Sequence, residues 1–172
     1  MGGSKSNKPT ADELRKLVNY DPATGIVTAK VRLSGHCAPG DEVGSLHHTG
    51  CLNTTLKRRH YTLSRLIYCW MTGEWPTRMI DHKNRDRKDN RWGNLRLATN
   101  GQNRANSISA GITTGIKGVW LRKRYKTGKP RYVSQITING KCCHLGHFDT
   151  LEAASVAYRV AAEKAFGQFA RV

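Results

Sequence analysis

The sequence predicts an α+β protein made of two folding units, and three observations support this prediction. Helical and strand-like hydrophobic patterns alternate over residues 10–108. Residues 109–115 are rich in Gly and Thr and lack hydrophobic periodicity, which is typical of a linker. Over residues 116–172, three strand patterns precede one long helical pattern, which predicts a three-stranded antiparallel sheet packed on one helix. Residues 1–9 are predicted to be disordered.

The first unit opens with a helical pattern over residues 10–20. Thr10 and Glu13 have the spacing of a capping box, and Leu14 and Val18 fall on one face of the helix. The other elements expected here are a strand over 26–33, two short strands within 50–63, a helix from a Ser64 cap to Trp70, and a helix that begins near Thr99 or Asn100.

The second unit contains a hairpin signal and a helix with clear ends. Asn139-Gly140 predicts a tight turn between two strands. Thr150 and Gly167 bound a helix with a stripe of alanines, which lets the helix lie close to a sheet. The predicted strands cover residues 119–123, 131–138 and 141–147, and the predicted helix covers 151–166.

The chain carries a large positive charge. It has 29 Lys and Arg against 12 Asp and Glu, which gives +17 at pH 7. The charge is spread along the whole chain, so a long polyanion is a more suitable partner than a point target. A membrane partner is not expected, because no apolar run approaches the roughly 18 residues that a spanning helix needs. The first residues also lack the apolar segment of a signal peptide.

The cysteines favour a reducing compartment. Their number is odd and their spacing unpaired, which suits the cytoplasm better than a disulfide scaffold. A zinc site is a minority alternative, because no C-x-x-C pair accompanies the cluster of candidate ligands. That cluster comprises His36, Cys37, His47, His48 and Cys51.

One polar constellation lies in an arginine-rich segment that is poor in apolar residues. Asp81 and Asn103 offer oxygen ligands and no thiolate, so they suit a hard cation such as Mg²⁺ or Mn²⁺. His82 is the histidine of this segment and the candidate general base toward an attacking water. Asn94 is the candidate hydrogen-bond partner that orients the imidazole. The alternative interpretation is a solvated basic loop.

This pattern resembles the HNH endonucleases of the homing type, which phages and introns encode. The residues that carry the resemblance are Asp81-His82, Asp89-Asn90-Arg91, Asn94-Leu95-Arg96 and Asn103. The resemblance implies a ββα-metal unit at about residues 77–108, in which a hairpin and a helix surround one metal ion. It also implies metal ligation by Asp81 and Asn103, His82 as general base with Asn94 as its orienting partner, and a product with a 5′ phosphate.

Two groups of side chains are predicted to bind DNA. The arginines around the constellation can grip phosphates with their planar fork, and the candidates are Arg85, Arg91, Arg96 and Arg104. In the second unit, Ile136 and Leu145 are taken to face the helix, so strand alternation defines an open sheet face. A ribbon of this kind fits the major groove of duplex DNA. The candidates on the open face are Trp120, Arg122, Arg124, Gln135, Thr137 and His144.

Residues 116–172 resemble the plant APETALA, or ethylene-response, DNA-binding domain. The matching stretches are G-V-W-L-R, R-Y-V-S-Q-I-T-I and H-L-G-H-F-D-T-L-E-A-A. The resemblance implies that the sheet binds in a DNA groove. Thr137, Cys142 and His144 depart from the Arg and Trp that the plant domains favour, so base preferences do not carry over.

Together these features predict a metal-dependent endonuclease, nicking or cutting both strands of duplex DNA, with sites selected by the C-terminal sheet. It is expected in the cytoplasm, that of a bacterial host if a phage encodes it. One alternative is a sequence-specific DNA-binding regulator with an inactive nuclease unit. Another is an RNA-binding or RNA-cleaving module, which the scarcity of Phe disfavours. Monomer and dimer are both compatible with the sequence.

Overall fold

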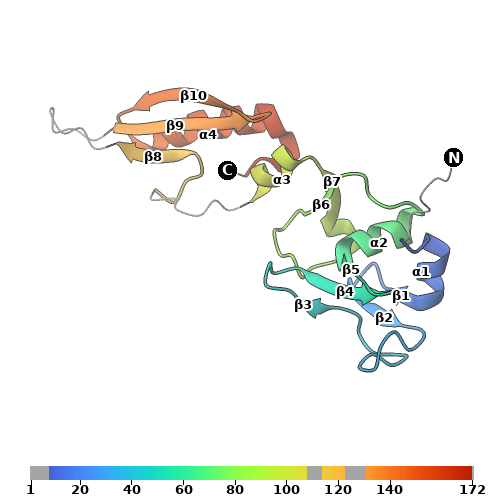
Figure 1. Cartoon of the computed structure of the whole chain (residues 1–172). Coiled ribbons are helices and arrows are strands. Elements are labelled where there is room, and N and C mark those ends of the chain that lie inside the picture. Colours follow the sequence, from blue (N-terminus) through green and yellow to red (C-terminus); the bar gives the residue numbers. More distant parts are fainter. Residues whose placement is uncertain (1–7, 108–113, 123–130, 172) are drawn as a thin grey trace. The chain divides into compact units, whose positions relative to one another are not determined.

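A computed structural model describes residues 8–107, 114–122 and 131–171 (Figure 1). The chain divides into two compact units, Met1–Leu97 and Ala98–Val172. Helices and strands occur in both units, so the predicted mixed content is confirmed. Most of the predicted disordered start and of the predicted linker lies outside the described residues. Within the described ranges, no helix is both long and apolar enough to cross a membrane.

The first unit combines short helices with three small sheets among its described residues. These sheets pair β1 with β2, then β3 with β4 and β5, then β6 with β7. The elements are α1 (Ala11–Leu17), β1 (Val18–Tyr20), β2 (Val27–Ala29), β3 (Ser45–Leu46), β4 (Leu52–Leu56), β5 (Arg59–Thr62), α2 (Leu63–Thr72), β6 (Met79–His82), the 3-10 helix η1 (Trp92–Asn94) and β7 (Leu95–Ala98).

Helix α1 begins where the sequence predicts but ends earlier. The capping box of Thr10 and Glu13 is present. The predicted helix over residues 10–20 stops at Leu17, because the next three residues pair with β2 as strand β1. Val18 and Tyr20 are both buried in this hairpin. A β-branched and an aromatic side chain suit a strand with a buried face, so tertiary packing overrides the helical period here.

Helix α2 begins before the predicted cap. Thr62 is the N-cap residue, and Ser64 lies inside the helix, where only 3% of its surface is exposed. The helix continues to Thr72, two residues beyond the predicted Trp70, and ends where Gly73 takes a left-handed φ of 89° at the C-cap. Glycine adopts this conformation without steric cost.

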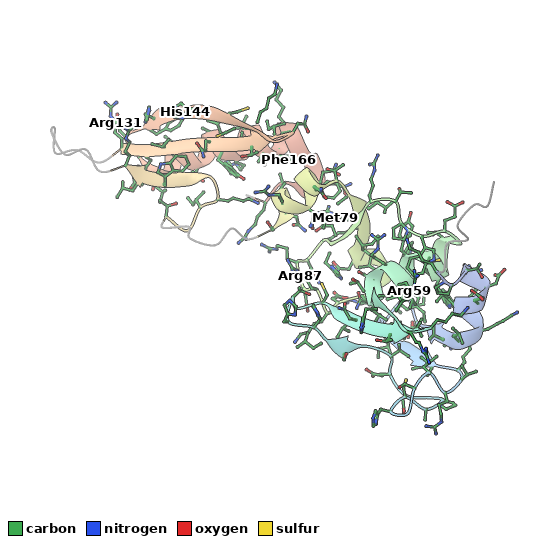
Figure 2. The ribbon with its side chains drawn as sticks, viewed as in Figure 1. Arg59, Met79, Arg87, Arg131, His144 and Phe166 are labelled. Carbon is green, nitrogen blue, oxygen red and sulfur yellow. The ribbon has the colours of Figure 1, made fainter. Side chains whose placement is uncertain are left out.

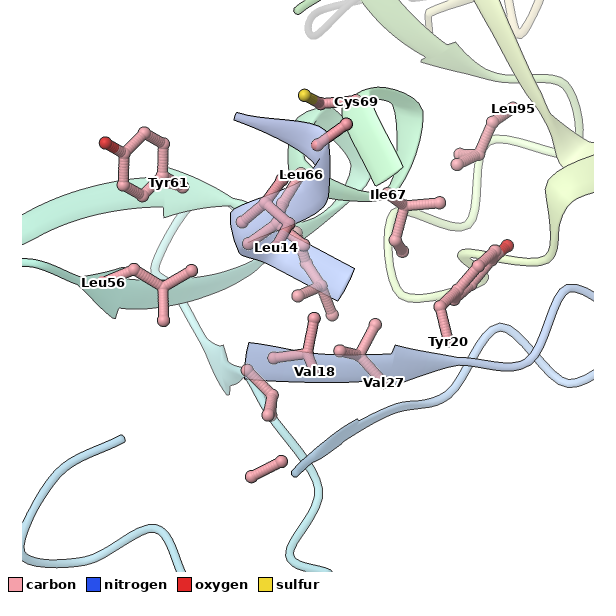
Figure 3. Close-up of a cluster of buried hydrophobic side chains, with 14 residues drawn as sticks. Leu14, Val18, Tyr20, Val27, Leu56, Tyr61, Leu66, Ile67, Cys69 and Leu95 are labelled. Carbon is pink, nitrogen blue, oxygen red and sulfur yellow. The ribbon is translucent and has the colours of Figure 1, made fainter. Parts of the chain in front are cut away.

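The core of the first unit lies between its two helices and its first strands. Leu14, Val18, Leu66 and Ile67 each have 0% exposure (Figure 3). Burying an aliphatic side chain of this size stabilises a fold by about 1.5–3 kcal/mol. Tyr20 extends this core toward the polar segment, because its hydroxyl donates to the backbone oxygen of Asn90 over 2.8 Å. The polar segment is therefore anchored on a rigid base.

The second unit contains a three-stranded antiparallel sheet in the order β10-β9-β8. Asn139 and Gly140 have φ values of 50° and 79°, as the tight turn between β9 and β10 requires. A bulge interrupts β10 between His144 and Gly146. The elements are α3 (Asn100–Asn106), β8 (Val119–Arg122), β9 (Arg131–Ile138), β10 (Lys141–Phe148), α4 (Leu151–Phe166) and the 3-10 helix η2 (Gly167–Phe169).

A second core forms between this sheet and α4. Val119 and Ile136 contribute from the sheet, and Ala154, Tyr158 and Ala162 contribute from the helix. The small alanines let the helix approach the strands closely.

Helix α3 belongs to the second unit, whereas the sequence prediction placed it with the first. Lys117 explains this assignment, because its ammonium donates to the backbone oxygens of Arg104, Ala105 and Ser107. These oxygens lie at the C-terminal end of α3, where the helix has no further turn to supply N–H donors. A cation there also suits the helix dipole. The lysine thus ties α3 to the strand that follows it.

Candidate functional site

The segment between β6 and β7 folds around its own polar side chains. Asn84, Asp86 and Asp89 each accept a hydrogen bond from a backbone N–H two residues later. The backbone N–H of Lys83 donates to the oxygen of Asn94 over 2.9 Å and closes the base of the loop. Asn and Asp favour such local bonds, which is why a segment that is poor in apolar residues adopts a defined shape.

Asn94 is the centre of this loop. Its Oδ1 accepts from the backbone N–H of Asn84 over 2.9 Å. Its Nδ2 donates to Asn84 Oδ1 over 2.9 Å and to the backbone oxygen of Asp89 over 2.7 Å. Both amide hydrogens are therefore used inside the loop. The predicted hydrogen bond from Asn94 to His82 is not formed, and Asn94 instead shapes the loop around the imidazole.

Asn90 holds the imidazole of His82 in place of Asn94. Asn90 Oδ1 lies 3.3 Å from His82 Nε2, and both side chains are buried. The amide of Asn90 is fixed in turn by donation to the backbone oxygen of Lys88. Because Oδ1 is an acceptor, we assign the ring hydrogen to Nε2 and the lone pair to Nδ1. Sequence reasoning missed this role, although Asn90 belongs to the D-N-R motif.

The turn at Gly25 permits this anchoring. Gly25 has a φ of 80°, and a Cβ there would lie 2.5 Å from the backbone nitrogen of Arg91 and 2.7 Å from the carbonyl carbon of Asn90. A side chain would push the turn away from the loop. Only glycine allows this close approach.

The environment of His82 keeps its imidazole neutral. Burial lowers the pKa of His82 from its ordinary value of 6.5. The Asn90 hydrogen bond and the charges of Asp81, Asp86 and Asp89 partly oppose this effect. A neutral imidazole at pH 7 can accept a proton, as a general base must.

Asp81 is paired with an arginine inside the protein. Arg96 Nε lies 2.8 Å from Asp81 Oδ2, and the side chains are only 11% and 5% exposed. The two residues stand on the paired strands β7 and β6. The sequence predicts that Arg96 binds a DNA phosphate, whereas in the structure its Nε donates to Asp81. Sequence reasoning missed this pair because it depends on strand register.

The remaining predicted arginines of the loop differ in their surroundings. Arg91 forms a two-pronged contact with Asp89, at 2.8 Å from Nε and 2.6 Å from Nη2. Arg85 is exposed and has a φ of 69°. Arg87, which the prediction did not single out, donates to the backbone oxygen of Thr49 and ties the loop to the β3–β4 turn.

The Arg91–Asp89 contact predicts an acid-sensitive contribution to stability. The Arg91 hydrogen bond is the main cause that lowers the pKa of Asp89 from 3.8 to about 2. Since the folded-state pKa is depressed, this contribution is present above the unfolded value and is lost as the pH falls toward 2. We expect the urea midpoint of the wild type to fall more steeply over this window than that of Arg91→Gln. Arg85→Gln is the matched control, and equal slopes for Arg91→Gln and the wild type would contradict the account.

Asn103 lies in the first half of α3, where Thr99 and Gln102 form a capping box. The predicted helix start at Thr99 or Asn100 is therefore correct. Asn103 is half-buried, and the neighbouring Arg104 is exposed. Asp81 and His82 belong to the first unit and Asn103 to the second. The meeting of Asp81 and Asn103 at one ion thus stays a prediction.

The zinc alternative finds no support in the described part of the chain. There, no group of three or more His, Cys, Asp or Glu side chains is arranged to hold a metal ion. His47 and His48 stack with ring centroids 3.9 Å apart, and His47 Nδ1 lies 3.0 Å from the Thr49 hydroxyl. These residues therefore contact one another and the β3–β4 turn.

The open face of the second sheet carries the residues that alternation predicts. Ile136 is buried against α4, so Gln135 and Thr137 face the other way. His144 pairs with Gln135 across β9 and β10, and Trp120 and Arg122 follow the same alternation on β8. Figure 2 labels His144 on this sheet. The predicted Arg124 lies outside the described residues.

Comparison with known proteins adds independent support for the first site. Residues 61–105 match the family model described as HNH endonuclease. The chain is also 30% identical over 110 residues to an uncharacterized HNH endonuclease of Acanthamoeba polyphaga mimivirus. That alignment covers 63% of this chain and 54% of the relative, so the chain spans about half the length of the curated relative it matches. No solved structure matches the chain.

The family match does not reach the sheet of the second unit, so the resemblance to the APETALA domain has no support from it. The match does include the loop, the imidazole and the paired carboxylate described above. Residues 61–105 are therefore similar to HNH endonucleases, and Asp81, His82, Asn94 and Asn103 all lie within the matched segment.

Proposed function

We propose that this chain is a metal-dependent endonuclease that hydrolyses phosphodiester bonds in duplex DNA, and that residues 77–108 form a ββα-metal unit. The observation that carries the proposal is the buried, neutral imidazole of His82, held by Asn90 next to the carboxylate of Asp81. A buried histidine with a shifted pKa and a fixed tautomer has the properties of a general base. The HNH match supports the same reaction class.

His82 would take a proton from the attacking water at Nδ1. Asn90 keeps the ring oriented, and the neutral state makes the nitrogen available at physiological pH. The loop that Asn94 shapes keeps Asn90 in position, so Asn94 acts as an indirect positioning residue. The expected product carries a 5′ phosphate.

The donor set fits a hard divalent cation. Asp81 presents a buried carboxylate and Asn103 an amide oxygen, and no thiolate accompanies them. These two residues would hold Mg²⁺ or Mn²⁺, which acts as a Lewis acid on the scissile phosphate. Arg96 neutralises the same carboxylate, so it competes with a cation for Asp81 and keeps the site stable without one.

The charge of the chain suits a DNA substrate. The net charge of +17 attracts a polyanion, and Arg85 and Arg104 are exposed near the motif residues in sequence. Arg91 forms an ion pair with Asp89, and its side chain remains 58% exposed. These three arginines would grip backbone phosphates.

We further propose that the open sheet face selects the DNA site. Arg122→Gln removes an exposed guanidinium from this face, and the loss of a base contact changes discrimination by about 1–3 kcal/mol. We therefore expect cleavage at related sites to rise relative to the preferred site, with little change in rate on saturating substrate. Lys141→Gln is the control, because Lys141 is exposed and alternates to the opposite side of the sheet. An unchanged ratio of sites in Arg122→Gln would remove this residue from site selection.

A labelled duplex tests the function directly. Cleavage should occur with Mg²⁺, leave a 5′ phosphate, and be inhibited far more by unlabelled duplex DNA than by RNA of equal length. Stronger competition by RNA would replace DNA by RNA as the substrate. Native and denaturing gels of the product distinguish a nick from a double-strand cut.

A second candidate function is a DNA-binding regulator with an inactive nuclease unit. The Arg96–Asp81 ion pair favours it, because a cation already occupies one carboxylate oxygen. This candidate predicts duplex binding without turnover at every Mg²⁺ or Mn²⁺ concentration. Turnover by the wild type would exclude it.

A further inference from the structure

A cavity in the second unit gathers positive charge. It has a volume of about 300 Å³ and lies among residues 115–117, α4 and the end of the described chain. Lys117, Arg159 and Arg171 line it together with Ser155 and Tyr158. No described residue that lines this cavity is acidic. It lies in a different unit from the His82 site and has no part in the chemistry proposed above.

Among the described residues, no ion pair balances the charge of this cavity. Arg171 Nη1 is buried and has no hydrogen-bond partner. The ion pairs formed among described residues involve none of the three cations. A buried guanidinium nitrogen without an acceptor costs free energy, and an anion can offset that cost. The arrangement is therefore expected of a site whose anion comes from outside the chain.

Lys117 fixes one wall of the cavity. Its ammonium donates to the backbone oxygens of Ala105 and Ser107 over 2.8 and 2.9 Å, as well as to Arg104. Burial, with the charges of Arg171 and Arg104, lowers the pKa of Lys117 to about 8. Lys117, Arg171 and Arg104 therefore lie close enough together for their positive charges to repel one another.

The chemistry of the lining indicates a phosphate oxyanion. Guanidinium groups bind phosphate oxygens with two parallel hydrogen bonds, and the Ser155 hydroxyl can donate another. A groove of about 960 Å³ in the same unit shares Lys117 and Tyr158 with the cavity. Gln102, Arg104 and Ser107 line this groove, which gives a polynucleotide a polar path that leads to the cavity.

We propose that the cavity of Lys117, Arg159 and Arg171 binds a phosphate group presented by a nucleic-acid strand. The identity of the strand as DNA rests on the proposed function, whereas the phosphate site itself does not. The site adds an anchor on the helix side of the sheet unit, apart from the open face. A phosphate bound there would offset the positive charge of Arg171.

Titration of the full chain with inorganic phosphate at constant ionic strength tests the site. Phosphate should raise the melting temperature of the wild type. Arg171→Gln should bind phosphate about tenfold more weakly, because it removes a charged hydrogen-bond donor from the site. Lys164→Gln, which removes an exposed charge from α4 outside the cavity, should bind as the wild type does. Equal binding by Arg171→Gln and the wild type would overturn the proposal.

Two further variants keep this test decisive. Arg171→Lys should keep part of the phosphate affinity that Arg171→Gln loses, because lysine retains the positive charge but lacks the planar guanidinium that forms two parallel hydrogen bonds. Arg159 is exposed, so Arg159→Gln repeats the test if Arg171→Gln does not fold. Full phosphate affinity in Arg159→Gln would then count against the cavity.

Duplex binding at several salt concentrations identifies the source of the phosphate. Loss of one phosphate contact should lower the slope of log K against log salt by about one in Arg171→Gln, but not in Lys164→Gln. Weaker phosphate binding with an unchanged salt slope would assign the site to a free phosphate and overturn the nucleic-acid assignment. Phosphate binding by a chain that cleaves no DNA would leave this site intact and refute only the nuclease function. Cleavage of DNA by a chain that binds no phosphate would refute this site and leave the nuclease function intact.

Discussion

His82→Ala is expected to lower the rate of DNA cleavage by about 10²- to 10⁴-fold, or about 3 to 5 kcal/mol. The imidazole is the buried, neutral group whose Nδ1 carries the lone pair once Asn90 accepts from Nε2. Without it, the attacking water has no positioned base. The measurement is the single-turnover rate on a labelled duplex with saturating Mg²⁺.

The control for this variant separates chemistry from folding and binding. His60→Ala removes an exposed imidazole that contacts Thr55 on the neighbouring strand, and its rate should match the wild type. DNA binding by His82→Ala should persist, because the phosphate contacts lie elsewhere. A folded His82→Ala protein that cleaves at the wild-type rate would remove His82 from the mechanism.

Arg96→Met is expected to lower the free energy of unfolding by about 3–5 kcal/mol, because it removes the cation from a buried ion pair. Asp81 is 5% exposed, so water cannot replace the guanidinium without a rearrangement of the strands. Such a loss is a large fraction of the stability of a small domain. Urea unfolding at neutral pH measures it.

The double variant Asp81→Asn with Arg96→Met is the matched control. It removes the buried negative charge along with the arginine, so it should recover most of the lost stability. Mg²⁺ should stabilise Arg96→Met more than the wild type, because the cation can then pair with Asp81 without competition. Arg96→Met with wild-type stability would show that the ion pair does not hold the site together. No effect of Mg²⁺ on either protein would argue against Asp81 as a ligand.

Local sequence signals predicted most of the second sheet and its helix. Strand β9 and helix α4 have the predicted bounds, and the turn at Asn139-Gly140 forms as expected. These elements depend on short-range rules of capping, turn chemistry and periodicity. The first unit followed these rules less closely. Val18 and Tyr20 continue a helical pattern, but their pairing with β2 decides their conformation.

The candidate site shows the same division between local and distant contacts. The motif located Asp81, His82 and Asn94 in one polar segment, and the structure buries all three. The sequence does not reveal which asparagine of the segment meets the imidazole, because the path of the loop depends on several side-chain bonds at once. The pairing of Arg96 with Asp81 depends on the alignment of β6 and β7. Likewise, the capping of α3 by Lys117 joins residues more than ten positions apart, so no local pattern indicates that α3 belongs to the second unit.

The central claim is that the segment around His82 is a working, metal-dependent nuclease site. Incubation of supercoiled plasmid with the wild-type chain, with Mg²⁺ and separately with a chelator, tests it most directly. The account predicts conversion to nicked or linear plasmid with Mg²⁺ and none with the chelator. Plasmid that stays supercoiled with Mg²⁺ and Mn²⁺, although the protein binds it, would contradict the claim.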